Sequence, residues 1–294
     1  MGKLKYTFKS DVLFKKLFVS YPELLKKLVS VLLRINYEDI EKFEIRNSEI
    51  IPESLGKKFC RLDINMEIDG QFIDLEIQVV NDGNYPERTL YYWAREYSSI
   101  LSEGEDYSKL PRTIIISIVA FELFPCEEYF SEFHALEATR YTLLTDKFNL
   151  IYFELPKLST NINTNNHLEL WLSLFRVETE EELRKLEALE VPDMQQAIKA
   201  YRHITVTPEF QELARLREKA GHDEAQALNK AKLDGKIEGR AEGRAEGRAE
   251  GRAEGQLERN IVIAKKLLEK NNSIEEIIDI TGLSIEEITK LQNS

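Results

Sequence analysis

The segment FCRLDINMEIDGQFIDLEIQVV, at residues 59–80, decides the fold, because two alternating apolar runs flank Asp69-Gly70. Asp-Gly between such runs is typical of a two-residue β-hairpin turn. This turn pairs Ile68 with Gln71, and the rest of the register follows. Side chains alternate along a strand, so one face of the hairpin should be apolar. That face is predicted to hold Leu62, Ile64, Met66, Ile68, Ile73, Leu75 and Ile77.

The other face of the predicted hairpin is polar and mostly acidic. Its residues are Arg61, Asp63, Asn65, Glu67, Asp74, Glu76 and Gln78. The register places Asp63 opposite Glu76, Asn65 opposite Asp74, and Arg61 opposite Gln78. Like charges directly opposite each other destabilise a sheet. A shared proton, a bound divalent cation or an open, solvated face would each relieve the repulsion, and the hairpin alone leaves all three open.

Four segments together resemble the PD-(D/E)XK nuclease superfamily and, within it, the recombination-promoting nuclease (Rpn) proteins, which are also described as transposase-like. The segments are SDVLFKKLF at 10–18, RLDINMEI at 61–68, IDLEIQVVND at 73–82 and YPERTLYYWAREYSSILSEGEDYSKLPRTIIISI at 85–118. All four lie within the first 155 residues. The resemblance implies an α/β fold with a restriction-endonuclease-like core and a helical C-terminal extension.

The resemblance also implies a metal site on the hairpin. Asp63 and Glu76 would hold Mg²⁺, with Mn²⁺ as an alternative ion, and the carbonyl of Ile77 would add a ligand. The metal would polarise the scissile phosphate and help to generate hydroxide from water. The superfamily usually has a lysine where this chain has Gln78. Glutamine can orient water but supplies no positive charge.

The first predicted helix offers two further candidates. Ser10 is expected to be its N-cap, and Asp11, Phe14, Lys15 and Phe18 share one helical face. The resemblance implies that Asp11 assists at the metal; alternatively, Asp11 is an ordinary first-turn residue that stabilises the helix dipole. We hypothesise that Lys15 supplies the charge that Gln78 lacks.

A second helix is expected in YPERTLYYWAREY, at 85–97, with Pro86 near its start. Arg88, Tyr91, Tyr92 and Arg95 share one of its faces. Arginine and tyrosine together can bind phosphate and stack on bases. For the tyrosines, packing on the sheet is the favoured interpretation. Lys15 of the first helix, together with Arg88 and Tyr92 of this helix, are the candidate DNA-binding residues.

Composition limits the functional classes. The net charge of −12 argues against a broadly basic DNA-binding protein, whereas a nuclease whose cation meets the phosphate tolerates it better. The N-terminal residues lack the apolar core of a signal peptide, and TIIISIVAF at 113–121 is too short to span a bilayer. Cys60 and Cys126 form no metal-binding spacing. We expect a cytoplasmic protein with reduced thiols and no membrane partner.

Composition and pattern also predict the domain organisation. Strands are expected in RTIIISIVAF at 112–121, FHALEATRYTLL at 133–144 and LIYFEL at 150–155, which complete a nuclease-like domain over 1–160. The polar linker STNINTNNH, at 159–167, leads into a helical region over 166–237. A strict four-residue GRAE repeat forms a linker over 238–256, and a small helix-turn-helix-like module covers 257–294.

The last two segments allow more than one role. In the repeat, glycines and like charges at i+4 should weaken an isolated helix, so a spacer is favoured over a helix that pairs with a second copy. The last helix of the C-terminal module begins with Glu286 and Glu287, which would repel phosphates. Docking or oligomerisation is therefore favoured over DNA reading for this module.

Two functions are consistent with the sequence. The first is a Mg²⁺-dependent DNA endonuclease that hydrolyses phosphodiester bonds, linked to recombination, mobile elements or phage defence. The second is a catalytically inactive DNA-binding or oligomerising protein of the same fold. In both, DNA is the expected partner, and the C-terminal helical segments are expected to form homo-oligomers.

Overall fold

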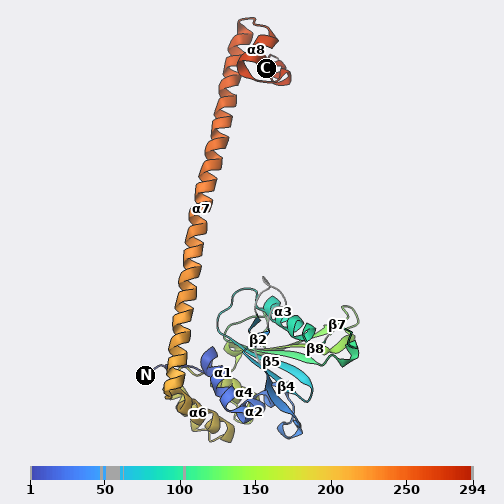
Figure 1. Cartoon of the computed structure of the whole chain (residues 1–294), viewed down its shortest axis with the longest axis vertical. Helices are drawn as coiled ribbons and strands as arrows, with labels where there is room; N and C mark the ends of the chain where they lie inside the picture. The colour runs from blue at the N-terminus through green and yellow to red at the C-terminus, as the bar shows by residue number, and fades with distance from the viewer. Residues whose placement is uncertain (1, 47–48, 51–59, 62, 102–103, 293–294) are drawn as a thin grey trace. The chain divides into compact units, whose positions relative to one another are not determined.

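The structure is a computed structural model that describes residues 2–46, 49–50, 60–61, 63–101 and 104–292. The chain divides into two compact units, Met1–Glu218 and Lys219–Ser294. The first unit holds a six-stranded sheet with helices on both faces, and the second is helical (Figure 1). The α/β fold with a helical C-terminal extension is thus confirmed.

The sheet is mixed, with the strand order β1-β4-β5-β6-β8-β7. Its central strands, β5, β6 and β8, run parallel, and the other neighbours are antiparallel. A separate short pair, β2 and β3, lies outside this sheet. The strands are β1 (Phe43–Arg46), β2 (Glu49–Ile50), β3 (Cys60–Arg61), β4 (Ile64–Ile68), β5 (Gln71–Gln78), β6 (Thr113–Val119), β7 (Phe130–Leu136) and β8 (Leu143–Glu154).

The β4–β5 hairpin has the predicted register, with Ile68 opposite Gln71 and Asn65 opposite Asp74. Asp69 and Gly70 both adopt positive φ, of 48° and 76°, as a type I′ turn requires. The ladder ends at the pair of Ile64 and Leu75. Leu62, predicted for the apolar face, lies outside the described residues, and the predicted pairing of Arg61 with Gln78 lies beyond the end of the ladder.

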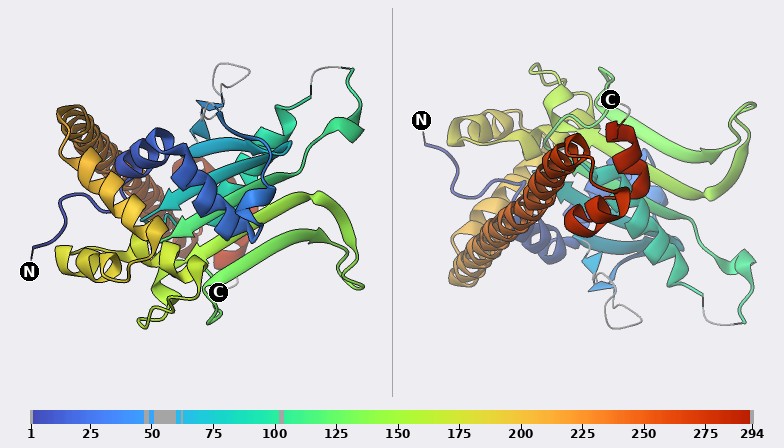
Figure 2. Two further views of the ribbon diagram at one scale, coloured as in Figure 1. Left: turned by 90° about the horizontal axis from the view of Figure 1, so that it is seen from below. Right: turned by 90° about the horizontal axis from the view of Figure 1, so that it is seen from above.

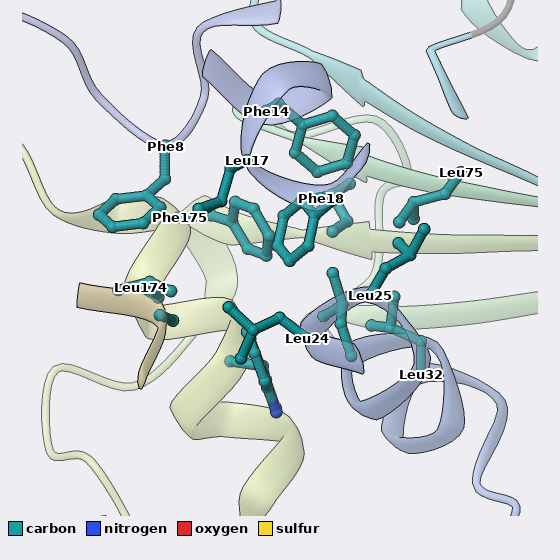
Figure 3. Packing of buried hydrophobic residues seen from close by; sticks show 14 of the residues in the cluster. Phe8, Phe14, Leu17, Phe18, Leu24, Leu25, Leu32, Leu75, Leu174 and Phe175 are labelled. Atoms are coloured by element: carbon teal, nitrogen blue, oxygen red, sulfur yellow. The ribbon is translucent and has the colours of Figure 1, made fainter. Parts of the chain in front are cut away.

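One face of the sheet carries the main hydrophobic core. Alternate residues of β4, β5, β6 and β8 are buried there against α1 (Asp11–Ser20), α2 (Pro22–Leu33), α4 (His167–Arg176), α5 (Glu180–Glu187) and α6 (Pro192–Thr205). Phe14 and Phe18 of α1 pack on Phe175 of α4, with ring centroids 5.8 and 6.3 Å apart (Figure 3). The left view of Figure 2 shows α1 and α2 lying across this face.

The opposite face of the sheet is covered by one helix, α3 (Tyr85–Ser98) (Figure 1). Tyr85 packs in a second apolar cluster with Ile115, Val119, Leu150 and Tyr152 of the sheet. Trp93, two turns along the same helix, also contacts this cluster, and its indole N–H donates to the carbonyl of Thr113 at 2.9 Å. The helix therefore lies over the polar face of the hairpin.

Of the strands predicted after the hairpin, the one in TIIISIVAF is confirmed and the one in FHALEATRYTLL is wrong. TIIISIVAF contains β6, which is buried along its whole length, as predicted. FHALEATRYTLL is not one strand, because it contains the end of β7, a turn and the start of β8. Tyr141 adopts a positive φ of 56° in this turn. The sequence has no Gly or Pro at this reversal of the chain, so the pattern did not predict a turn there.

The long helix α7 (Pro208–Glu269) contains the whole GRAE repeat, whose residues are helical and exposed. The C-terminal module of the second unit packs the end of α7 on α8 (Ile274–Thr281) and α9 (Ile285–Gln292) around Ala264, Ile277, Leu283 and Ile288. Ser273 forms a capping box with Glu276, and Gly282 ends α8 at φ 65°. The predicted last helix, with Glu286 and Glu287 in its first turn, is present as α9. The boundaries at residues 160, 237 and 256 stay predictions.

Candidate active site

Asp63 and Glu76 lie side by side at the point where the β4–β5 ladder ends. The backbone N–H of Asp63 donates to Oε1 of Glu76 at 2.9 Å. In return, the backbone N–H of Ile77 donates to Oδ2 of Asp63 at 2.9 Å. Each carboxylate thus accepts a hydrogen bond from the backbone of the segment that carries the other. These reciprocal contacts hold the two acidic side chains against one short stretch of backbone.

The polar face of the hairpin is not solvated. Glu76 is 6% exposed and Asp74 is 1% exposed, and Asn65 is buried with them. Asp63 is half-buried. The interpretation of this face as open and wet is therefore wrong, because α3 and its tyrosine and tryptophan side chains cover the sheet here.

Burial dominates the electrostatics of the pair. It raises the pKa of Asp63 from its usual 3.8 to about 6, while the Ile77 N–H, Lys15 and Arg88 lower this pKa and Asp11 raises it. Burial, and then the charge of Asp63, raise the pKa of Glu76 well above its usual value. Two buried acids that resist ionisation in this way are a site that a cation can stabilise.

The donor set fits a divalent cation of the Mg²⁺ type. Each carboxylate uses one oxygen on a backbone N–H, and the described contacts leave the second oxygen of each without a hydrogen bond. The N–H of Ile77 is directed at Asp63, and in an extended strand the carbonyl of the same residue lies on the same side of the strand. No group of three or more His, Cys, Asp or Glu side chains in the described ranges could hold a metal. Two carboxylates with waters and phosphate oxygens are the environment that Mg²⁺ tolerates.

Gln78 ends β5 on the same face as Glu76, two residues further along. Its side-chain amide donates to the carbonyl of Val80 at 2.7 Å, and its backbone carbonyl accepts from Ala120 at 2.9 Å. The amide nitrogen is therefore engaged within its own loop. The side-chain oxygen remains as the atom that could orient a water molecule.

The first helix brings charge close to the pair. Asp11 and Lys15 of α1 both act on the pKa of Asp63, in opposite directions. Asp11 also pairs with Arg217 of α7, with Nε to Oδ2 at 2.8 Å. Ser10 is the N-cap residue, although its side chain makes no capping hydrogen bond. Asp11 thus makes two contacts, because its Oδ1 accepts from the Val12 N–H in the first turn at 2.8 Å and its Oδ2 pairs with Arg217 of α7.

Comparison with known proteins decides the family. Residues 8–231 match the family model described as PD-(D/E)XK nuclease family transposase. The chain belongs to this family. No curated protein and no solved structure matches it.

Helix α3, which follows the β4–β5 hairpin in the chain, carries Arg88. Arg88 acts on the pKa of both Asp63 and Glu76, stacks over Tyr85 at 4.7 Å, and pairs with Asp82 at 3.3 Å. Of the three candidate DNA-binding residues, Lys15 and Arg88 therefore lie near enough to the pair to act on the pKa of Asp63. The third, Tyr92, is half-buried on the same helix as Arg88.

The expectation that the tyrosines pack on the sheet is not met by Tyr91, whereas Tyr92 is half-buried. Tyr91 is 38% exposed, and within the described residues neither ring joins the apolar cluster under α3. Tyr85, Thr89 and Trp93, spaced at i, i+4 and i+8, form the packed face instead. The adjacent pair Tyr91-Tyr92 drew attention to the wrong side of the helix.

The sequence reasoning also missed a buried polar cluster beside the pair. Asn65 hydrogen-bonds Asp74, and Arg46 of β1 pairs with Glu96 of α3 at 3.2 Å. Burial, and then the charge of Glu96, raise the pKa of Asp74 well above its usual value. Oδ2 of Asp74 is buried without a hydrogen bond within the described residues. Glu96 could have been found, because it continues the Tyr85, Thr89 and Trp93 face by three residues.

The described residues contain no helix both long and apolar enough to cross a membrane.

Proposed function

We propose that this PD-(D/E)XK family chain is a Mg²⁺-dependent DNA endonuclease that hydrolyses phosphodiester bonds. The observation that carries the proposal is the reciprocal contact of Asp63 and Glu76, which holds two acids of raised pKa together at a strand end. Family membership supports a nuclease. The link to recombination, mobile elements or phage defence, and a cytoplasmic location, belong to the same proposal.

The side chains divide the work of an in-line displacement. Asp63 and Glu76 would hold the cation, with the Ile77 carbonyl as a further ligand. When bound, the cation polarises the phosphate and lowers the pKa of the attacking water. The water would give up a proton to the solvent as its oxygen bonds to phosphorus, and the leaving oxygen, once its bond to phosphorus breaks, would take up a proton from the solvent. The oxygen of the Gln78 side chain would orient the water.

Positive charge near the phosphate would come from Lys15 and Arg88 rather than from Gln78. Both lower the pKa of Asp63, so both act electrostatically at the pair. Each would stabilise the charge that develops on the phosphate oxygens. Asp11, held by Arg217, would position the α1 end of the site rather than bind substrate. Tyr92 would contact DNA beyond the site.

One observation favours a second candidate, an inactive DNA-binding or oligomerising protein. The amide of Gln78 replaces the usual lysine and is tied to Val80. If Lys15 and Arg88 do not supply the missing charge, the metal site would lack an element that its relatives use.

Cleavage of supercoiled plasmid separates the two functions. Purified full-length protein is incubated with Mg²⁺, Mn²⁺ or EDTA, beside Asp63→Asn and Glu76→Gln, which keep the shapes and the hydrogen-bond acceptors of the pair. Glu67→Gln is the matched control, because Glu67 lies on the same strand face outside the pair. A single-stranded RNA of equal length tests the choice of nucleic acid.

The proposal predicts metal-dependent nicking by wild type and Glu67→Gln, with a loss of at least 100-fold in both pair variants. Equal nicking by all four proteins would place the activity elsewhere or in a contaminant. No nicking by wild type with either metal would favour the inactive protein. Cleavage of RNA alone would replace DNA as the substrate.

A further inference from the structure

Residues 232–259 of α7 repeat by residue class, not only by letter. The segment reads KLDG, KIEG, four copies of RAEG, and QLER. The order basic, apolar, acidic, glycine holds through the first six blocks, with Lys in place of Arg, Asp in place of Glu, and Leu or Ile in place of Ala. Leu257 and Glu258 keep the apolar and acidic places in the last block. A physical period of four residues therefore extends beyond the exact GRAE repeat.

On an α-helix this order forms four separate rows. Because each residue turns the helix by about 100°, residues of one class follow each other with a drift of about 40° per block. For an apolar residue at position i, the basic residues at i−1 and i+3 lie on one side of it. The acidic residues at i−3 and i+1 lie on its other side. The glycines lie on the opposite face, about 160° away. The apolar row is thus a seam between a basic row and an acidic row.

The charges of these two rows cannot neutralise each other within one helix. Basic and acidic residues from 232 to 258 are separated by two or six positions, whereas helical ion pairs form at three or four. At a separation of four, each charge meets its own sign. In the described structure, residues 231–259 accordingly form no ion pair. The opposite charges that would satisfy these rows must come from outside the helix.

The seam itself is apolar and uncovered. It continues from the alanines into Leu233, Ile237 and Leu257, which are 59%, 58% and 45% exposed. Every residue from 231 to 259 is exposed. A lone helix with these glycines and like-charge neighbours gains little stability by itself. Covering the seam would bury the large apolar residues at its two ends and the alanine methyls between them.

We propose that the seam pairs with the same seam of a second copy, in parallel and in register. A two-fold axis parallel to the helices places the basic row of each copy against the acidic row of the other, on both sides of the seam. An antiparallel pair would instead place acidic on acidic and basic on basic. A nucleic acid would meet the acidic row as well as the basic one. The second copy is the occupant whose charges match both rows.

The period also sets the hand of the pair. Four residues turn an α-helix by about 400°, so the seam moves around the helix by about 40° per block in the right-handed sense. A partner that stays on the seam must therefore wind around it in the right-handed sense. Small residues at four-residue spacing allow the two backbones to approach closely in such crossings. The Gly face, which offers no side chain to bury, stays outside the pair. The proposal is independent of nuclease activity.

Disulfide trapping tests the seam in the full-length chain. In a background with Cys60→Ser and Cys126→Ser, single cysteines are introduced as Ala241→Cys, Ala253→Cys and Gly247→Cys. Gly247→Cys is the matched control, because its Cβ would meet open space and its position faces away from the seam. After mild oxidation, covalent dimers are quantified on non-reducing gels. Mixtures of Ala241→Cys and Ala253→Cys chains of different tag length report orientation, because the two sites are about 18 Å apart along a helix.

The proposal predicts at least a fivefold excess of covalent dimer at 241 and 253 over 247, with self-pairs only in the mixture. Mixed 241–253 pairs would overturn the parallel orientation. A maximum at 247 would overturn the choice of seam. Light scattering of the wild-type chain must show a dimer, and a monomer at 100 μM would overturn the pairing itself.

Charge reversal gives a second readout that does not depend on oxidation. One variant replaces the four arginines of the RAEG blocks by glutamate, and another replaces the four glutamates of these blocks by lysine. Each alone should be monomeric, because like charges of these blocks then face each other across the seam, and an equimolar mixture should restore a heterodimer. Dimers of equal stability in every sample would contradict pairing through this seam. The substituted positions are 240, 244, 248 and 252 in the first variant, and 242, 246, 250 and 254 in the second.

Discussion

Replacing Asp63 by asparagine should stabilise the metal-free protein, and only at the higher pH values. The asparagine keeps an oxygen to accept from the Ile77 N–H and removes a charge whose burial is unfavourable. The folded state of wild type raises the pKa of Asp63 from 3.8 to about 6. Between these values the folded chain binds more protons than the unfolded chain, so the free energy of unfolding falls as pH rises.

The size of this effect follows from the shift. One pKa unit corresponds to 1.36 kcal/mol, so the ionised Asp63 lowers the free energy of unfolding by about 3 kcal/mol above pH 6. The variant escapes this loss. At pH 4 the difference in the free energy of unfolding should be below about 1 kcal/mol, and from pH 6 to 8 Asp63→Asn should unfold at a temperature roughly 6 to 12 °C higher.

The assay is thermal unfolding of the full-length chain, followed by circular dichroism in EDTA at each pH unit from 4 to 8. Glu67→Gln serves as the control and should track wild type within about 0.5 kcal/mol. Parallel pH curves for wild type and Asp63→Asn would refute the reasoning, because the gap would then not come from titration. A variant less stable than wild type at pH 8 would show that Asp63 contributes more through its contacts than its charge costs.

Three further predictions use the same structure. Mg²⁺ affinity should rise steeply from pH 5 to 7, because Asp63 must lose its proton to bind a cation. Isothermal titration calorimetry at each pH measures this affinity. An affinity that does not change with pH would show that the pair is not the site. Lys15→Ala and Arg88→Ala should each lower plasmid cleavage at saturating metal by 10-fold or more with unchanged circular dichroism, and unchanged turnover in both would remove them from the mechanism. Arg46→Met should lower the free energy of unfolding by roughly 1–3 kcal/mol, because it leaves Glu96 buried without its partner. Adding Glu96→Gln should recover part of that loss, as measured by urea unfolding. A double variant no more stable than the single one would contradict the pairing.

The hairpin register was predictable because turn chemistry and alternation agree. Asp69 and Gly70 accept positive φ, and the flanking runs alternate without interruption, so only one pairing buries the apolar side chains. The proximity of Asp63 to Glu76 follows directly from that register. Sequence reasoning reached this pair because both residues belong to one local unit of structure.

The burial of the polar face was not predictable from the hairpin alone. It depends on which face of α3 meets the sheet, and that helix has aromatic residues on more than one side. Tyr85 and Trp93 contact the sheet, while Tyr91 faces solvent. The ion pair of Asp11 joins residues still further apart in the sequence, because its partner Arg217 is 206 residues further along the chain. Such pairings follow from the packing of the whole unit and leave no local signal.

The central claim is that Asp63 and Glu76 together hold one divalent cation. The most direct test is electron paramagnetic resonance of Mn²⁺ titrated into the full-length protein at pH 8, beside Asp63→Asn, Glu76→Gln and the Glu67→Gln control. We expect one bound Mn²⁺ per chain in wild type and the control, and no site of comparable affinity in either pair variant. Undiminished Mn²⁺ binding in both pair variants would contradict it.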